Sequence, residues 1–151
     1  MKALFNDDTT YGQQQFSAFM LRLTLGVILL AHGLLKVFVF TIPGTVGYFA
    51  SIGFPALFAY IVIVAEISAG LALIVGVLTR LVALLTLPIL LGASWVHAGN
   101  GWVFSNEGGG WEFPVVLVVL AITVAIQGAG NFSLKTLFSD KKHAGQRHSV
   151  A

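Results

Sequence analysis

The sequence predicts an all-α membrane protein, a bundle of four transmembrane helices with a short extracytoplasmic interfacial helix between helices 1 and 2. Three observations predict this fold class: an apolar composition, four long apolar stretches, and an uneven distribution of basic residues. Of 151 residues, 57% are apolar and only 9% are charged, with a mean hydropathy of +0.91. A soluble domain carries about 25% charged residues, so this chain has too few polar groups to cover a surface in water.

Four apolar stretches are long enough to cross the hydrocarbon core of a bilayer, which takes about 20 residues. The connection between the first two, residues 41–55, is rich in aromatic and branched side chains, which indicates a helix lying in the membrane interface. The four predicted spans are residues 16–40, 56–77, 81–98 and 111–128.

The basic residues predict the orientation of these spans. Seven of the 8 Lys and Arg residues lie at one side of the membrane if the spans alternate in direction, and only Lys36 lies at the other. By the positive-inside rule, both termini are cytoplasmic. We therefore divide the chain into a cytoplasmic N-terminal segment, a four-helix transmembrane domain and a flexible cytoplasmic tail, which cover residues 1–15, 16–137 and 138–151.

Composition also excludes several kinds of chemistry. The chain contains no cysteine, so it cannot supply a disulfide, a thiolate metal ligand or an iron–sulfur ligand. We predict no metal site. Any redox role then requires a bound cofactor or a partner protein to carry electrons. The net charge of +2 comes with no basic patch interleaved with aromatics, so we expect the lipid bilayer, and not nucleic acid, as the partner.

Ionisable side chains inside apolar spans are the candidate functional residues, because burying them is costly. At about 100° and 1.5 Å per residue, each span has one face that combines its polar and small residues, and we expect these faces to meet at the bundle axis. In the fourth span this face comprises Glu112, Val116, Val119, Thr123 and Gln127. The candidate ligand-binding residues are Arg22, His32, Lys36, Glu66, His97 and Glu112.

The depths of these residues predict a two-level site. His32, Lys36, His97 and Glu112 fall near the extracytoplasmic ends of their spans and are expected to form one cluster above Glu66, which lies near mid-membrane. A lone carboxylate there costs about 2.5–3.5 kcal/mol, so we expect Glu66 to be paired or to act as a proton carrier.

Four of these candidate residues also have a purely structural explanation. Arg22 is either a topology anchor at the cytoplasmic boundary or a partner of Glu66, and Lys36 is either a snorkelling terminal residue or that partner. His97 is alternatively an interfacial residue. Glu112 is alternatively a favourable charge at a helix N-terminus.

Together these motifs resemble the DoxX family of small four-helix bacterial inner-membrane proteins. The matching elements, over about residues 16–137, include Arg22 with Gly26, His32-Gly33 with Lys36, Glu66 with Gly70, and the closing stretch GAGNFSL. The resemblance implies a bacterial cytoplasmic (inner) membrane location and a redox-linked role. Some members are similar to the quinone-side subunit of an oxidoreductase, and many have no established activity.

The favoured function is a membrane subunit that binds a quinone-like lipophilic molecule and serves a partner oxidoreductase, at most as its non-catalytic or quinone-side subunit. The alternatives are a small proton-coupled transporter or exporter that uses Glu66, and a structural scaffold whose charges specify helix pairing. A haem b held by His32 and His97 is the least favoured hypothesis. A homo-oligomer is compatible with all of them.

Overall fold

A computed structural model describes residues 9–134, and within this part of the chain every regular element is helical. The predicted tail, residues 138–151, lies outside the described residues, so the division into domains stays a prediction. A 3-10 turn, Ala98–Asn100, continues the fourth α-helix. The five α-helices are α1 (Tyr11–Phe38), α2 (Ile42–Ser51), α3 (Ala56–Val75), α4 (Thr79–His97) and α5 (Glu112–Gln127).

Three of these helices are long and apolar enough to cross a membrane: α1, α3 and α4 extended by the 3-10 turn. The fourth predicted span corresponds to α5, an apolar helix of 16 residues, which is shorter than the usual span of about 20. Helix α1 begins earlier than predicted because Thr10 and Gln13 form a capping box, in which each side chain bonds the backbone of the other.

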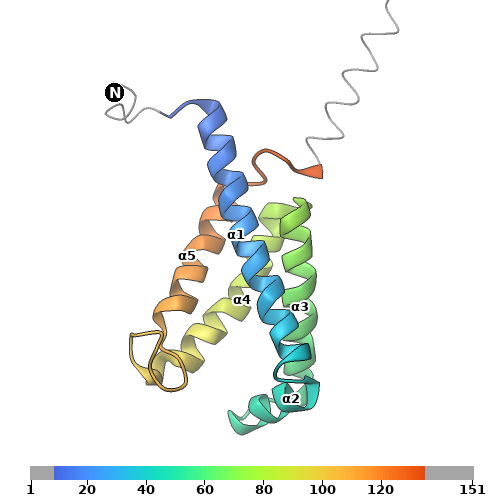
Figure 1. Ribbon diagram of the computed structural model, residues 1–151, viewed down its shortest axis with the longest axis vertical. Coiled ribbons are helices and arrows are strands. Elements are labelled where there is room, and N and C mark those ends of the chain that lie inside the picture. The colour runs from blue at the N-terminus through green and yellow to red at the C-terminus, as the bar shows by residue number, and fades with distance from the viewer. Residues whose placement is uncertain (1–8, 135–151) are drawn as a thin grey trace, which may run out of the picture.

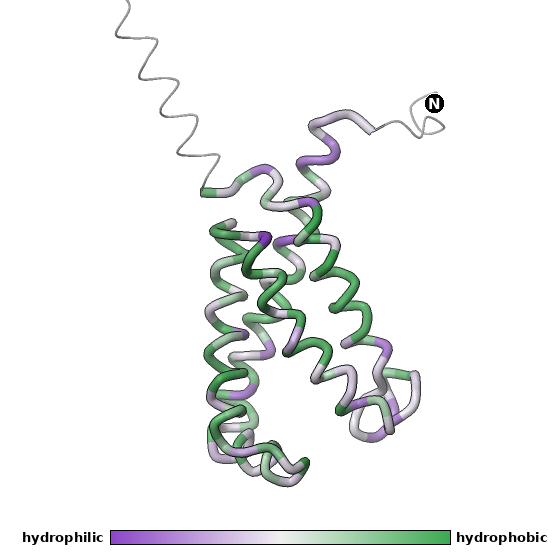
Figure 2. The backbone as a smooth tube through the Cα atoms, turned by 180° about the vertical axis from the view of Figure 1, so that it is seen from behind, coloured by the Kyte–Doolittle hydropathy of each residue, from purple (hydrophilic) through white to green (hydrophobic). Residues whose placement is uncertain are grey.

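The helices form two pairs. Helix α1 packs along α3, and α4 packs along α5. The pairs converge where α1 begins and α5 ends, here called the Arg22 end, and diverge toward α2 and the loop of residues 98–111, here called the α2 end (Figure 1). Apart from the hydrophilic first turns of α1, apolar residues dominate the long helices, as Figure 2 shows.

Glycines bring α1 and α3 into backbone contact. A Cβ added at Gly70 would lie 2.6 Å from the backbone nitrogen of Leu30 and 2.8 Å from the carbonyl oxygen of Gly26. A Cβ at Gly33 would lie 2.6 Å from the side chain of Ile67. The two helices can therefore approach this closely only because small residues line the contact.

The buried faces of three helices agree with those expected from helical phase. The predicted inward stripe of α1, from Arg22 through Gly26 and Leu29 to Gly33, is buried, as is Glu66 with its neighbours on α3. On α4, Thr86 and Leu90 are buried.

The predicted inward face of α5 is wrong. Val116 and Val119 are both 59% exposed, whereas the buried residues are Pro114, Leu117, Ala121 and Val124. The prediction followed the polar residues of the span. Helix α5 instead turns an apolar face to the core, and the hydroxyl of Thr123 donates to the carbonyl of Val119 in its own helix.

Candidate functional site: a buried ion pair beside a half-buried histidine

Lys36 on α1 and Glu66 on α3 form an ion pair. Lys36 Nζ lies 2.9 Å from Glu66 Oε1 and 2.7 Å from Oε2, so the ammonium donates to both carboxylate oxygens. The side chains are 18% and 8% exposed, respectively. This is the only salt bridge within residues 9–134. The expected partner of Glu66 is therefore Lys36 and not Arg22.

Neighbouring backbone contacts hold the two charges in place. Gly33 lies one turn before Lys36, and a Cβ there would come within 3.3 Å of the Glu66 Cβ. At the end of α1, the buried hydroxyl of Thr45 donates to the Lys36 carbonyl over 3.0 Å. Thr45, which lies on α2, thus ties the short helix to the backbone of the ion-pair lysine.

His32 lies one helical turn before Lys36, on the same side of α1. Its Nδ1 is 2.8 Å from the carbonyl oxygen of Ile28. Its ring stacks on Phe113 of α5 at a centroid distance of 5.9 Å and an interplanar angle of 22°. The histidine, one turn from Lys36, therefore joins this part of α1 to α5 of the second helix pair.

Arg22 belongs to a different site, at the Arg22 end. It is completely buried, and its guanidinium donates to five carbonyls, which matches the five N–H donors that the group possesses. Two of these carbonyls belong to the last turn of α3, where the helix dipole favours a cation. The other three lie in the segment after α5. The acceptors are the carbonyls of Leu73, Ile74, Ala129, Asn131 and Phe132.

The left-handed residue Gly76 leaves room for this guanidinium. Its φ is +80°, and a Cβ at this position would lie 2.8 Å from Arg22 Nη1. Through these hydrogen bonds, Arg22 links α1 to α3 and to the segment that follows α5. It is neither a mere boundary charge nor the partner of Glu66.

His97 and Glu112 are bonded within the loop that joins α4 to α5. His97 Nδ1 is 3.0 Å from the Gly109 carbonyl, and Glu112 Oε1 accepts from the Phe104 backbone N–H over 2.6 Å. No hydrogen bond within the described residues joins the members of the predicted four-residue cluster to one another. Lys36 bonds Glu66, while His97 and Glu112 bond the loop between α4 and α5.

Two aromatic contacts connect the helix pairs where they diverge. His32 and Phe113 link α1 to α5, and Phe54, just before α3, meets Trp95 of α4 at a centroid distance of 6.3 Å. Sequence reasoning did not assign Phe113 or Thr45 to the site. Neither side chain is ionisable, so neither was recognised as a candidate from the sequence. The packing of α5 brings Phe113 to the site, and the packing of α2 brings Thr45 there.

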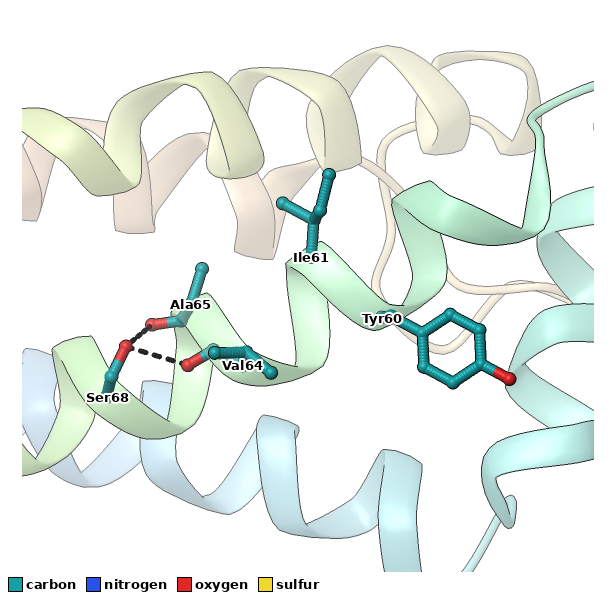
Figure 3. A pocket seen from close by; sticks show the side chains of 5 residues that line it. All are labelled: Tyr60, Ile61, Val64, Ala65 and Ser68. Atoms are coloured by element: carbon teal, nitrogen blue, oxygen red, sulfur yellow. Dashed lines mark hydrogen bonds between the residues drawn. The ribbon is translucent and has the colours of Figure 1, made fainter.

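A groove on the exposed flank of α3 does not contain the ion pair. It is lined by Tyr60, Ile61, Val64, Ala65 and Ser68 (Figure 3). The Ser68 hydroxyl donates to the carbonyls of Val64 and Ala65 in its own helix. The groove therefore presents a mainly apolar surface with no charged side chain, and the polar chemistry lies at the ion pair. No group of three or more potential metal ligands occurs within residues 9–134.

Comparison with known proteins decides the family, because the DoxX family model matches residues 17–99. The chain belongs to the DoxX family. The match includes α2, α3, all of α4 and residues 17–38 of α1, and with them both members of the ion pair. With its three long apolar helices, this DoxX protein is a membrane protein in contact with the lipid bilayer.

Two curated proteins are similar in sequence to this chain. "Putative oxidoreductase CatD" of Bacillus subtilis (strain 168) is 29% identical over 130 residues, covering 85% of this chain and 92% of the relative. An "Uncharacterized protein" of Haemophilus influenzae (strain ATCC 51907 / DSM 11121 / KW20 / Rd) is 33% identical over 98 residues. That match covers 64% of this chain and 56% of the relative. No solved structure matches the chain significantly.

Proposed function

We propose that this DoxX protein is an inner-membrane subunit that binds a quinone-like lipophilic molecule beside Lys36, Glu66 and His32, and that it serves a partner oxidoreductase. The observation that carries the proposal is the ion pair itself. Two opposite charges lie together within an apolar bundle, and the imidazole of His32 lies one helical turn away. Charged groups at such depth are costly and are typical of functional sites in membrane proteins.

The chemistry of the three side chains suits a quinone head group. A quinone needs a hydrogen-bond donor at its carbonyl oxygens and a group that exchanges protons when it is reduced. Lys36 Nζ uses two donors on Glu66 and has a third. Glu66 is the candidate proton carrier. The name of the Bacillus subtilis relative, "Putative oxidoreductase CatD", supports a redox-linked role.

The chain contains no cysteine, so its side chains supply neither a thiol redox couple nor thiolate ligands for an iron–sulfur cluster. The proposed role is therefore that of a quinone-side subunit, with electrons delivered by the partner. We further propose that α1, α3, α4 and α5 all cross the membrane, that α2 lies in the extracytoplasmic interface, and that both termini are cytoplasmic. The basic residues support that orientation.

Quinone binding tests the proposal directly. The protein is placed in nanodiscs, incubated with a short-chain quinone and separated from free ligand, and the retained quinone is compared with that of empty nanodiscs. We expect saturable retention that Glu66→Gln reduces at least fivefold, because this variant removes the charge that holds the Lys36 ammonium in place. Val27→Ala, at an α1 position that is 50% exposed, is the matched control and should bind as the wild type does.

Two outcomes would contradict the proposal: retention no greater than that of empty nanodiscs, or equal retention by all variants. In the first case the competing role is proton-coupled transport. It would be supported if proteoliposomes took up a substrate in response to a pH gradient and lost that uptake with Glu66→Gln.

A further inference from the structure

The His32 ring has a defined tautomer. Its Nδ1 lies 2.8 Å from the Ile28 carbonyl oxygen, and a carbonyl oxygen can only accept. Nδ1 therefore carries the hydrogen, and in the neutral imidazole Nε2 carries the lone pair. Nε2 forms no hydrogen bond within the described part of the chain, so the ring presents an acceptor and no second donor.

The ring cannot easily exchange these roles. Stacking on Phe113, with the planes 22° apart, fixes the ring plane, and the bond to Ile28 fixes which nitrogen faces its own helix. A rotation that exposed Nδ1 would break this hydrogen bond. The residue is only half-buried, and Nδ1, not Nε2, forms the bond to the helix.

Lys36 offers the complementary group one turn further along α1. Two of its three ammonium hydrogens are directed to Glu66 Oε1 and Oε2, which leaves one donor. The site thus presents one donor at Lys36 and one acceptor at His32. A fully oxidised quinone has only carbonyl acceptors and would leave His32 Nε2 unpaired. A quinol has hydroxyl groups that both donate and accept.

We infer that this site prefers the reduced, hydroxyl-bearing form of its ligand, whose ring hydroxyl donates to His32 Nε2 while a ligand oxygen accepts from Lys36. The inference rests on the proposed quinone-binding function and adds the redox form to it. It concerns binding alone and involves no bond making or electron transfer.

The experiment compares a short-chain benzoquinone with its quinol, kept reduced under anaerobic conditions, on the full protein in nanodiscs. We expect the quinol to bind about fivefold more tightly than the quinone, which is in the range that one hydrogen bond provides. His32→Gln places its amide oxygen near the Nε2 position and should keep the preference. His32→Asn, which reaches only as far as Nδ1, and His32→Phe, which keeps the stacking on Phe113, should lose it.

Each outcome bears on one claim. Equal affinity of the wild type for both forms, or a preference unchanged in His32→Phe, overturns the inference and leaves the proposed function standing. No binding of either form above empty nanodiscs overturns the proposed function. ¹⁵N-histidine NMR of the wild type needs no variant: the Nε2 resonance of His32 should shift on adding quinol and stay in place on adding quinone. The reverse pattern, or no shift with bound quinol, contradicts the inference.

Discussion

At the scale of single residues, the pairing of Lys36 with Glu66 makes a prediction about stability. Removing one member of a buried ion pair leaves an uncompensated charge, which costs about 3–5 kcal/mol. Lys36→Met should therefore lower the thermal midpoint in nanodiscs strongly. Glu66→Gln also leaves one charge uncompensated, the Lys36 ammonium. Its effect should be smaller, because the amide oxygen still accepts from Lys36 and the lysine side chain is the more exposed of the two, at 18% against 8%.

The double variant Lys36→Met/Glu66→Leu distinguishes the contribution of the ion pair to stability from that of side-chain packing. It should be more stable than Lys36→Met alone, because no charge is then left unpaired. Additive losses in Lys36→Met, Glu66→Leu and the double variant, measured by thermal unfolding, would show that the pair contributes no coupling energy.

Arg22 makes a second residue-scale prediction. Lysine has three donors on one nitrogen and cannot reproduce the fork of a guanidinium, so Arg22→Lys would leave at least two carbonyls without a donor. At about 1–3 kcal/mol for each such group, we expect a loss on the order of 2–6 kcal/mol. Arg80→Lys, at an exposed position, is the control. A thermal midpoint equal for both variants would contradict the proposal that the hydrogen bonds of Arg22 stabilise the fold.

At the scale of helices, the contact of α1 with α3 depends on the absence of a side chain at Gly70. Gly70→Ala would place a methyl group against the Leu30 backbone, and such overpacking costs about 1–3 kcal/mol. Gly92 is the matched control, since it lies in α4 and has nothing within 4 Å of an added Cβ. Gly92→Ala should stabilise by up to about 1 kcal/mol through helix propensity. Thermal midpoints that fall equally in both variants would contradict this account.

The helices also show what periodicity can predict. On α1 and α3 the polar and small residues share the face that is buried, because glycines permit the close contact and Lys36 pairs with Glu66 across it. On α5 the same reasoning failed. Glu112 is bonded to the loop and Thr123 to its own helix, so neither requires a place at the axis, and the apolar Leu117 and Ala121 are buried instead.

At the scale of the whole molecule, the number of spans makes a topology prediction. The chain has no cysteine, so single cysteines can report which side of the membrane each position faces. If α5 crosses, Ser105→Cys in the 98–111 loop should react with an impermeant maleimide on intact cells. Thr9→Cys and Gln127→Cys should react only after lysis. Labelling of Gln127→Cys on intact cells would show that α5 does not cross.

The sequence by itself determined the helical class, the helix boundaries to within a few residues, and the presence of costly ionisable groups within apolar segments. These properties follow from composition and local periodicity, which act within one segment of chain. Tertiary structure alone decided which charges meet. Arg22 and Lys36 were both candidate partners of Glu66. The α1–α3 contact brings Lys36 to the carboxylate, while the guanidinium of Arg22 donates to the carbonyls of residues 73, 74, 129, 131 and 132. Helical phase gives a direction for each side chain but cannot specify the partner, since partners depend on how segments distant in sequence pack together.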